Sequence, residues 1–511
     1  MKNIFLVKNL NNLLLFCSSI IPLYFLYLSW DTLIIDHMGF RQTQTALTTF
    51  WISSSSIFEF ITPVFGYPWS IPLEYPIYQI IVSVLSDLSS LSLENSARLV
   101  SIFSFYLALL PIHYLLKDGI RDHLIFYIFY LSSPILLFFS HTFLIESFSF
   151  LLSVSVLASF IFFTEKKSLR TAFLFICIAA LCGLQKITGL MASLIGCGVY
   201  SLFILYNTHK SELGKKVTVL AIVFIFSIIL PIAWVLYTDE FKSSGYITSF
   251  VTSEALSNWN YGTLSQRLDV SNLAKVFGFR LVILGGMVTI FARLIFYKLK
   301  CIHENSIAIS SMCAGLFGPI VFFNLYLVHD YYMIASIGFI GLGLYLLPDV
   351  RQVRFTNIAI TQSFFIFLTL SINLSIFLYW YSPKINNIPQ SHKDMFTVAQ
   401  IVKSKVRPDE VILTAGADWD STIPYYTERY AIMLPSWERN DFTPTYDGDF
   451  FNPIYVLENI DDYLDDRDLG AIIICKTRLA EDYTIAVRYI RNNWILNWND
   501  VGDCSYGIIE N

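Results

Sequence analysis

The chain has 511 residues, of which 55% are hydrophobic and only 14% are charged. Soluble domains carry about 25% charged residues, so the composition excludes an ordinary soluble protein. The net charge of −5 argues against nucleic acid as a partner, because proteins that bind it present basic surfaces. The eight cysteines include no CxxC pair and no His/Cys cluster with zinc spacing.

Many stretches of the chain lack charged side chains for longer than about 18 residues, the length that spans lipid. These runs are too long for barrel strands, and only helices and closed barrels satisfy their backbone within lipid. The pattern predicts a polytopic α-helical membrane protein with about eleven transmembrane helices within residues 1–380. No small-residue cleavage site follows the first run, so we expect it to be retained as a helix. The expected spans are residues 12–30, 97–116, 122–140, 147–164, 171–185, 189–206, 217–237, 276–297, 306–327, 331–348 and 356–380.

The loops between these spans differ in positive charge. If the N-terminus is cytoplasmic, the inner loops hold fifteen Lys and Arg and the outer loops hold seven. Positive residues favour the cytoplasmic side, so the first long loop and the C-terminal region are predicted to lie outside. The remaining twelve Lys and Arg residues lie in the C-terminal region. They do not affect this orientation, because large domains translocate regardless of charge.

The first outer loop, residues 31–96, contains a polar stretch at 36–78 between two apolar runs. Most connections need only a handful of residues, whereas a long polar loop more often carries function. Residues 46–60 and 77–93 mix apolar residues with hydroxyls or charge, which predicts two juxtamembrane helices at the membrane interface. The link between them is expected to be irregular but stiff, because it contains Pro63, Gly66, Pro68, Pro72 and Pro76.

Residues 381–511 are more charged than the rest and change in pattern. Strand-like runs (EVILTAG, GAIIICK) alternate with helix-like runs (MFTVAQIVKSK, YTIAVRYIRNNW), which predicts a small extracytoplasmic α/β domain. Cys475 and Cys504 either form a disulfide, if the compartment is oxidising, or remain two reduced core thiols.

The scarce ionisable residues gather in five places that this topology puts on the outer face. These are the start of the first outer loop, PLEYPIYQ (72–79), SHTFLIES (140–147), LQKITG (184–189) and HDYY (329–332). Charged groups at membrane depth are costly and are therefore functional candidates. A carboxylate can deprotonate an acceptor, and cations can neutralise a departing phosphate. The candidate catalytic carboxylates are Asp36, Glu74 and Glu146, and the candidate substrate-binding residues are His37, Arg41, Gln42, Gln44, Lys186, His329, Asp330, Tyr331 and Tyr332.

Each candidate also has a purely structural interpretation. Asp36 can pair with Arg41 inside the loop, and Glu74 can brace the Pro-rich link. Glu146 can cap the N-terminus of a helix, and Lys186 can extend to the lipid headgroups. The HDYY residues can be ordinary loop residues with an aromatic belt. A functional site requires instead that these distant segments meet around one pocket at the outer edge of the membrane.

The chain resembles the GT-C superfamily of glycosyltransferases, and within it bacterial members similar to protein mannosyltransferases and to the aminoarabinose transferase of lipid A. The resemblance covers the architecture of the first ten spans. At motif level it covers the first outer loop, SPILLFFSHTFLIES (133–147), LQKITG, HDYY and, more weakly, DWDSTIPYYTERYAIMLP (418–435). It implies an inverting transfer from a polyprenyl-phosphate sugar, with the acid of the first outer loop as base.

One departure from that family concerns the base. The relatives carry adjacent Asp and Glu followed by an aromatic residue and Ala, whereas the comparable place here reads RQTQTA. By position in the loop, Asp36 takes the role of base, and Glu74 is the other possibility. The lost second acid weakens the case for a divalent metal, which prefers several oxygen ligands. We therefore expect no cofactor, and a divalent metal is left as an alternative that the sequence does not support.

These observations predict a glycosyltransferase of the bacterial inner membrane. Its partners would be a polyprenyl-phosphate-linked sugar, membrane lipids, and a lipid, glycan or protein acceptor that the C-terminal domain helps to bind. A transporter or flippase of lipid-linked sugars would predict inverted repeats and charged residues in mid-span, and neither is evident in the sequence. A polymerase or ligase shares the compartment and the lipid carrier, but such enzymes usually place their long loop late in the chain.

Overall fold

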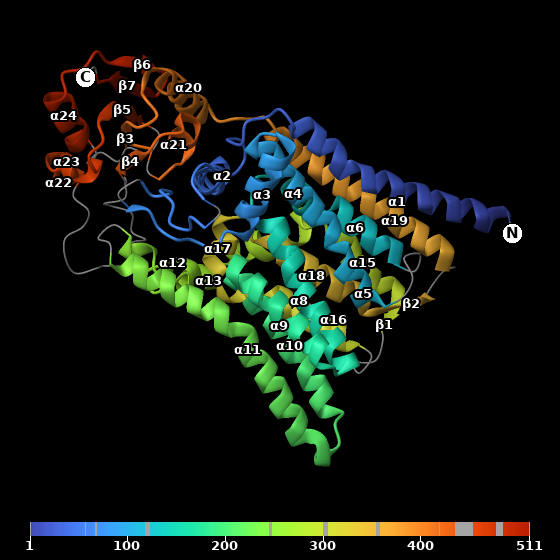
Figure 1. Ribbon diagram of the computed structural model, residues 1–511. Helices are drawn as coiled ribbons and strands as arrows, with labels where there is room; N and C mark the ends of the chain where they lie inside the picture. The colour runs from blue at the N-terminus through green and yellow to red at the C-terminus, as the bar shows by residue number, and fades with distance from the viewer. Residues whose placement is uncertain are drawn as a thin grey trace. The chain divides into compact units, whose positions relative to one another are not determined.

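The computed structural model describes residues 2–56, 58–66, 69–117, 123–244, 248–299, 305–353, 358–417, 419–434, 453–476 and 484–509 (Figure 1). Outside these ranges lie Pro68, the two ends of the motif 418–435 (Asp418 and Pro435), and three of the fifteen basic residues of the predicted inner loops (Arg121, Lys300 and Arg354). Contacts within the chain define two compact units. Unit 1 comprises Met1–Thr32, Ala97–Val235 and Asn258–Pro383, and unit 2 comprises Leu33–Ser96, Leu236–Ser257 and Lys384–Asn511.

Unit 1 is built almost entirely from helices. They are α1 (Lys2–Ser29), α4 (Leu93–Leu107), α5 (Leu109–Leu116), α6 (Leu124–Ser132), α7 (Pro134–Phe139), α8 (Glu146–Lys166), α9 (Leu169–Gln185), α10 (Ile187–Tyr206), α11 (Lys210–Ser243), α12 (Ser257–Tyr261), α13 (Leu264–Leu268), α14 (Val270–Leu273), a π-helical segment (Ala274–Leu284), α15 (Val288–Phe296), α16 (Ser306–Val321), α17 (Phe323–Val328), α18 (Met333–Leu346) and α19 (Ile358–Trp380). The short strands β1 (Tyr297–Leu299) and β2 (Pro348–Val353) pair antiparallel.

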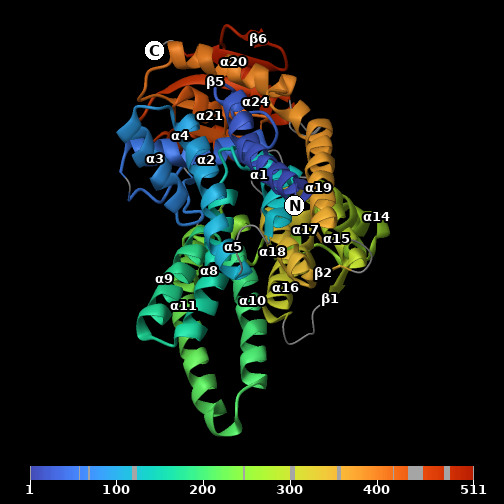
Figure 2. The ribbon, with the colours of Figure 1, turned by 90° about the vertical axis from the view of Figure 1, so that its right-hand side faces the viewer.

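Two groups of helices form the core of unit 1. Helix α8 packs on α9, α10 and α18, and α16 packs on both α10 and α18, while α1, α6 and α19 pack together (Figures 1 and 2). Small residues bring α10 and α16 close. A Cβ at Gly196 would lie 3.0 Å from the Ser310 carbonyl oxygen and 3.1 Å from the Ala314 Cβ. Close backbone approach of this kind stabilises helix pairs in lipid through van der Waals packing.

The long apolar helices confirm a multi-pass membrane fold. Within the described residues, six helices are long and apolar enough to cross a membrane, or seven if one bent pair is counted as a span. They are Leu10–Ser29, Leu93–Leu116, Glu146–Lys166, Ile187–Tyr206, Lys210–Ser243 and Thr361–Lys384. Where the structure describes them, the eleven predicted spans coincide with helical segments, but several are shorter or broken. Residues 122–140 divide into α6 and α7 because Pro134 begins a new helix.

The predicted span 276–297 is not a straight helix. The π-helical segment and α15 meet at an angle of 79°, and the break falls at Gly285 and Gly286. Gly286 has φ +71°, and a Cβ there would lie 2.6 Å from the Asn373 Oδ1. Only glycine adopts this conformation without steric cost, and the close approach of Asn373 leaves no room for a side chain.

Arg98 fixes the end of the first span within unit 1. Its guanidinium is buried and donates to the Thr32 carbonyl oxygen at 2.6 Å and to the Trp30 carbonyl oxygen at 3.3 Å. The last carbonyls of a helix have no partner within it. Arg98 therefore supplies hydrogen-bond donors to backbone carbonyls where α1 ends and the first loop begins.

Unit 2 contains both helices predicted for the first loop, α2 (Gly39–Ser54) and α3 (Ile77–Ser89). They pack against each other, and Thr62 pairs with Ile71 in the link between them. Helix α2 is rich in hydroxyls yet largely buried. Thr43, Thr45, Thr48 and Thr49 each donate to the carbonyl four residues back, which satisfies these hydroxyls within the helix. The Thr48 hydroxyl also lies 3.4 Å from the Thr62 hydroxyl in the link.

The C-terminal part of unit 2 is the predicted α/β domain. Its sheet has the strand order β4-β3-β5-β7-β6, in which β3 lies parallel to β4 and β5, and β7 lies antiparallel to β5 and β6. Helix α20 packs on β5, β6 and β7. A disulfide joins Cys475 to Cys504, which is one of the two predicted alternatives. The strands and helices are β3 (Val411–Ala415), β4 (Ala431–Leu434), β5 (Leu469–Cys475), β6 (Asn499–Val501), β7 (Cys504–Ile508), α20 (Gln390–Lys405), α21 (Thr422–Thr427), α22 (Pro453–Glu458), α23 (Ile460–Leu464) and α24 (Thr484–Asn493).

Candidate functional site

The first polar cluster, in unit 2, is built around the start of α2. Met38 has φ +63° and turns the chain into the helix at Gly39. Gln42, one turn into α2, is buried, and its Nε2 donates to the Asp36 Oδ1 at 2.8 Å and to the His37 carbonyl oxygen at 3.1 Å. The turn and the amide together set the direction of the Asp36 carboxylate.

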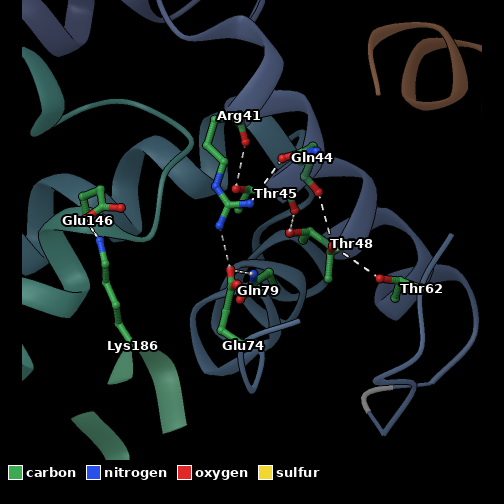
Figure 3. Close-up of polar contacts among 10 residues, drawn as sticks. Arg41, Gln44, Thr45, Thr48, Thr62, Glu74, Gln79, Glu146 and Lys186 are labelled. Atoms are coloured by element: carbon green, nitrogen blue, oxygen red, sulfur yellow. Dashed lines mark hydrogen bonds and ion pairs between the residues drawn. The ribbon is translucent and has the colours of Figure 1, made fainter. Parts of the chain in front are cut away.

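The next residues of α2 reach the Pro-rich link and α3 (Figure 3). The Arg41 Nη1 donates to the Gln44 Oε1 at 3.2 Å, and its Nη2 forms an ion pair with the Glu74 Oε1 at 3.5 Å. Gln79 on α3 donates to the same Glu74 oxygen at 3.3 Å. The structure therefore brings Arg41, Gln44 and Glu74 together, and it adds Gln79, which the sequence analysis did not identify.

Gln79 carries a further signal of binding. Its side chain is buried, and its Oε1 has no hydrogen-bond partner among the described residues. Buried polar atoms are normally paired, so an unpaired amide oxygen beside an ion pair is suited to accept a hydrogen bond from a ligand. A glutamine in an apolar run (IYQIIV) is the sequence signal that points to this residue.

The second polar cluster lies in unit 1, at the N-termini of two membrane helices. Glu146 is the first residue of α8, and Lys186 lies in the single-residue break between α9 and α10. Their side chains form an ion pair (Figure 3). The Lys186 ammonium lies 4.4 Å from the centre of the Tyr332 ring. A carboxylate at a helix N-terminus is favoured by the helix dipole, and the ring face stabilises the cation.

A small cavity adjoins this ion pair. It has a volume of about 20 Å³, enough for about one water molecule. The Ser149 hydroxyl is buried and has no hydrogen-bond partner among the described residues. The residues around the cavity, besides Glu146, Lys186 and Tyr332, include Ser149, Ser153, Thr188, Tyr326 and Ser336. The sequence analysis missed the serines, since hydroxyls in apolar helices commonly bond their own backbone.

The HDYY residues have different environments. Tyr332 lines the cavity, and His329 stacks on Tyr331, with their ring centres 5.1 Å apart. Asp330 is buried, and its Oδ2 accepts a hydrogen bond of 2.9 Å from the hydroxyl of Tyr381, the residue directly after α19. The Tyr332 side chain thus joins the Glu146–Lys186 cluster, whereas the contacts seen for Asp330 hold α19 beside this loop.

The predicted residues therefore fall into two clusters, one in each unit. Asp36, His37, Arg41, Gln42, Gln44 and Glu74 belong to the first, and Glu146, Lys186 and Tyr332 belong to the second. A single pocket that all of them share remains a prediction. No group of three or more His, Cys, Asp or Glu residues suited to a metal ion occurs within the described ranges, and a metal-free site also remains a prediction.

The fold has counterparts among solved structures. ArnT from Cupriavidus metallidurans in the apo state is 11% identical, with a TM-score of 0.60, and the match covers 99% of this chain and 97% of that chain. The same protein bound to undecaprenyl phosphate is 12% identical, with a TM-score of 0.61 and the same coverage. No protein-family model matches the chain, and no curated protein matches it by sequence. The chain therefore has the fold of ArnT over nearly its whole length, in agreement with the architecture that the resemblance implied.

Proposed function

We propose that this protein is a glycosyltransferase that moves a sugar from a polyprenyl-phosphate donor to an acceptor at the outer face of the bacterial inner membrane. The observation that carries the proposal is the likeness of fold to ArnT, one structure of which is bound to undecaprenyl phosphate. The two polar clusters supply what such a transfer needs, namely an oriented carboxylate and cations for a phosphate.

The proposed reaction is a single displacement at the anomeric carbon. An acceptor hydroxyl or amine attacks this carbon and forms the new glycosidic bond, while the bond from the carbon to the phosphate oxygen breaks. The acceptor proton passes to the carboxylate base, and the polyprenyl phosphate leaves with the bonding electrons. Attack on the face opposite the leaving group inverts the anomeric configuration.

Asp36 is the proposed base, and Glu74 has a supporting role. Gln42 orients the Asp36 carboxylate through a hydrogen bond of 2.8 Å. The Glu74 carboxylate is shared between Arg41 and Gln79, an arrangement that suits a residue holding a cation in place. In this proposal Arg41 and Gln44 contact the phosphate or the sugar, and His37 supports the turn that carries Asp36.

Lys186 is the proposed phosphate ligand in the membrane helices. Its ammonium is held by Glu146 and Tyr332, so it is already desolvated and oriented at a helix start. The positive N-terminal ends of α8 and α10 also favour an anion there. Glu146 and Tyr332 position Lys186 in the resting site, and the remaining HDYY residues, His329, Asp330 and Tyr331, shape the wall for sugar or acceptor.

The proposed orientation places the N-terminus in the cytoplasm and the C-terminal domain outside. Positive charge in the predicted inner loops supports this orientation. The Cys475–Cys504 disulfide supports it as well, because disulfides persist in oxidising compartments.

One observation favours a transporter of lipid-linked sugars as the second candidate. The helix pair Val270–Leu284 and Val288–Phe296 is bent by 79°, and discontinuous helices often form the binding sites of transporters. The two functions differ in what happens to the donor, since a transporter moves it intact and a transferase cleaves it.

The test uses purified full-length protein in detergent, where no membrane gradient exists. Undecaprenyl phosphate is added first. At a ligand concentration of about one hundred times Kd, binding should raise the free energy of unfolding by about 2–3 kcal/mol. Undecaprenyl-phosphate monosaccharides are then added with an acceptor extract, and release of free undecaprenyl phosphate is measured. Binding without release would favour the transporter, and the absence of both would contradict the proposal.

A further inference from the structure

The C-terminal segment 419–434, part of the DWDSTIPYYTERYAIMLP motif, has no role in the chemistry proposed above. It lies in unit 2 together with the first outer loop, and its aromatic side chains pack on that loop. The Tyr430 ring stacks on Trp51 of α2, with centres 4.1 Å apart and planes inclined by 11°. The Trp419 ring meets Phe65 edge to face, with centres 4.3 Å apart.

Two tyrosine hydroxyls of α21 form hydrogen bonds near the two ends of the first outer loop. The Tyr425 hydroxyl donates to the Glu94 Oε1 at 2.7 Å, in the first turn of α4. The Tyr426 hydroxyl accepts a hydrogen bond of 3.4 Å from the Ile34 backbone N–H, two residues before Asp36. Both rings are buried, so the C-terminal domain contacts the loop at its entry, along α2 and at its exit.

A buried acid and a histidine complete this contact at the start of α2. The Asp420 carboxylate is 4% exposed, and its Oδ1 accepts hydrogen bonds from the Thr422 backbone N–H at 3.0 Å and from the Thr422 hydroxyl at 2.5 Å. Its Oδ2 lies 3.2 Å from the Nε2 of His392, a residue of α20. A Cβ placed on Gly39 would lie 3.8 Å from the same His392 nitrogen, so the imidazole is close to the first residue of α2.

We infer that His392 and Asp420 are positioning residues for the proposed transfer, because they support the turn at Met38 and Gly39 that directs Asp36 and Arg41. Thr422 holds the Asp420 carboxylate, the carboxylate holds the His392 imidazole, and the imidazole nitrogen lies close to Gly39, where α2 begins. The catalytic consequence rests on the proposed function, whereas the mechanical consequence for α2 does not. The C-terminal domain is thereby a support for the first outer loop, in addition to any role in acceptor binding.

The test compares His392→Leu, His392→Gln and Asp394→Asn in the full-length protein. Leucine removes the polar contact with Asp420, whereas the glutamine amide can restore a donor near the position of Nε2. Asp394 is the matched control, since it is a buried carboxylate of the same helix whose hydrogen bonds run to Gln390 at 2.7 Å and to the Asp503 N–H at 3.0 Å.

Two measurements separate positioning from general stability. Amide hydrogen exchange of residues 39–45 should accelerate by about tenfold in His392→Leu, and kcat for donor cleavage should fall by about tenfold or more while KM for the donor stays within about twofold. The His392→Gln variant should recover most of both effects. Asp394→Asn should lower the melting temperature yet leave the exchange of α2 and kcat within about twofold of the parent.

The inference is overturned if His392→Leu leaves the exchange of α2 unchanged, or if Asp394→Asn alters α2 and kcat to the same extent. If the parent protein cleaves no polyprenyl-phosphate sugar but the exchange pattern is as expected, the support of α2 stands and the proposed function fails. The two outcomes are therefore distinguishable.

Discussion

Lys186 forms an ion pair with the buried carboxylate of Glu146, across the starts of two membrane helices. From the sequence alone, each residue had a separate structural interpretation: Lys186 as a lipid anchor and Glu146 as a helix cap. Their pairing beside a small cavity brings together two segments that lie 40 residues apart in the sequence. In the proposed transfer, the donor phosphate replaces this carboxylate beside the Lys186 ammonium.

The first prediction concerns the stability of this pair. Lys186→Met leaves the Glu146 carboxylate buried without its cation, and the free energy of unfolding should fall by about 3 kcal/mol. The double variant Lys186→Met/Glu146→Gln removes both charges and should recover about half of that loss or more. Thermal or denaturant unfolding in a fixed detergent measures both losses.

Lys216→Met, which breaks the more exposed pair with Glu212, is the control and should lower the free energy of unfolding by less than about 1 kcal/mol. Equal losses for Lys186→Met and Lys216→Met would contradict the structural role of the buried pair.

The second prediction concerns acid stability of the C-terminal domain. Burial by itself raises the pKa of Asp420, but His392 and the two hydrogen bonds from Thr422 outweigh burial and hold this pKa below its usual value. A carboxyl whose pKa is lower in the folded state stabilises the fold above its unfolded pKa, and this stabilisation is lost as pH falls through the folded pKa. The contribution is therefore present at neutral pH and lost below about pH 4.

Asp420→Asn should accordingly reduce stability at pH 7 and flatten its decline between about pH 5 and pH 3. Hydrogen exchange of β3 and α21 as a function of pH is the measurement. Asp409→Asn, at a side chain that is 74% exposed, controls for the change in net charge. A decline in Asp420→Asn as steep as in the parent would show that Asp420 does not carry this acid sensitivity.

The third prediction concerns the disulfide between β5 and β7. Cys475 and Cys504 are 29 residues apart. Closing a loop of this length lowers the entropy of the unfolded chain and thereby stabilises the folded domain by about 3–4 kcal/mol. Cys504→Ser should destabilise the C-terminal domain by a similar amount, and reduction of the parent should do the same. Cys313→Ser, at a free thiol of the membrane helices, should leave that domain unaffected. Thiol labelling in intact cells should find Cys475 and Cys504 blocked if the domain is extracytoplasmic. Free thiols at these positions in cells would contradict the proposed orientation.

Hydrophobic patterning predicted the membrane fold, the two loop helices and the α/β domain, because each depends on local periodicity. It placed the first loop helix at 46–60, whereas α2 begins at Gly39. The difference arises because Gln42, Thr43, Gln44 and Thr45 look like loop residues in sequence. Their burial depends on partners such as Asp36 and on bonds to their own backbone, and periodicity does not reveal such partners.

The broken span and the Asp330 contact show a similar limit. Gly285 and Gly286 mark the bend in sequence, since paired glycines often punctuate a helix, but the 79° angle also requires Asn373 packed against Gly286. Asp330 stood out as a charged residue near the membrane, yet Tyr381, directly after another helix, holds its carboxylate. Contacts between residues about 50 or more positions apart are set by packing, which one sequence read alone does not specify.

The most direct test of the account measures donor cleavage by purified protein and by Asp36→Asn. A panel of undecaprenyl-phosphate monosaccharides is supplied with an acceptor extract, and free undecaprenyl phosphate is quantified over time. The account predicts that the parent cleaves at least one donor and that Asp36→Asn lowers kcat by about 10²–10⁴ with little change in KM, while Lys216→Met retains full activity. Equal kcat values for the parent and Asp36→Asn would contradict the assignment of Asp36 as base, and no cleavage by the parent of any donor would contradict the proposed transfer itself.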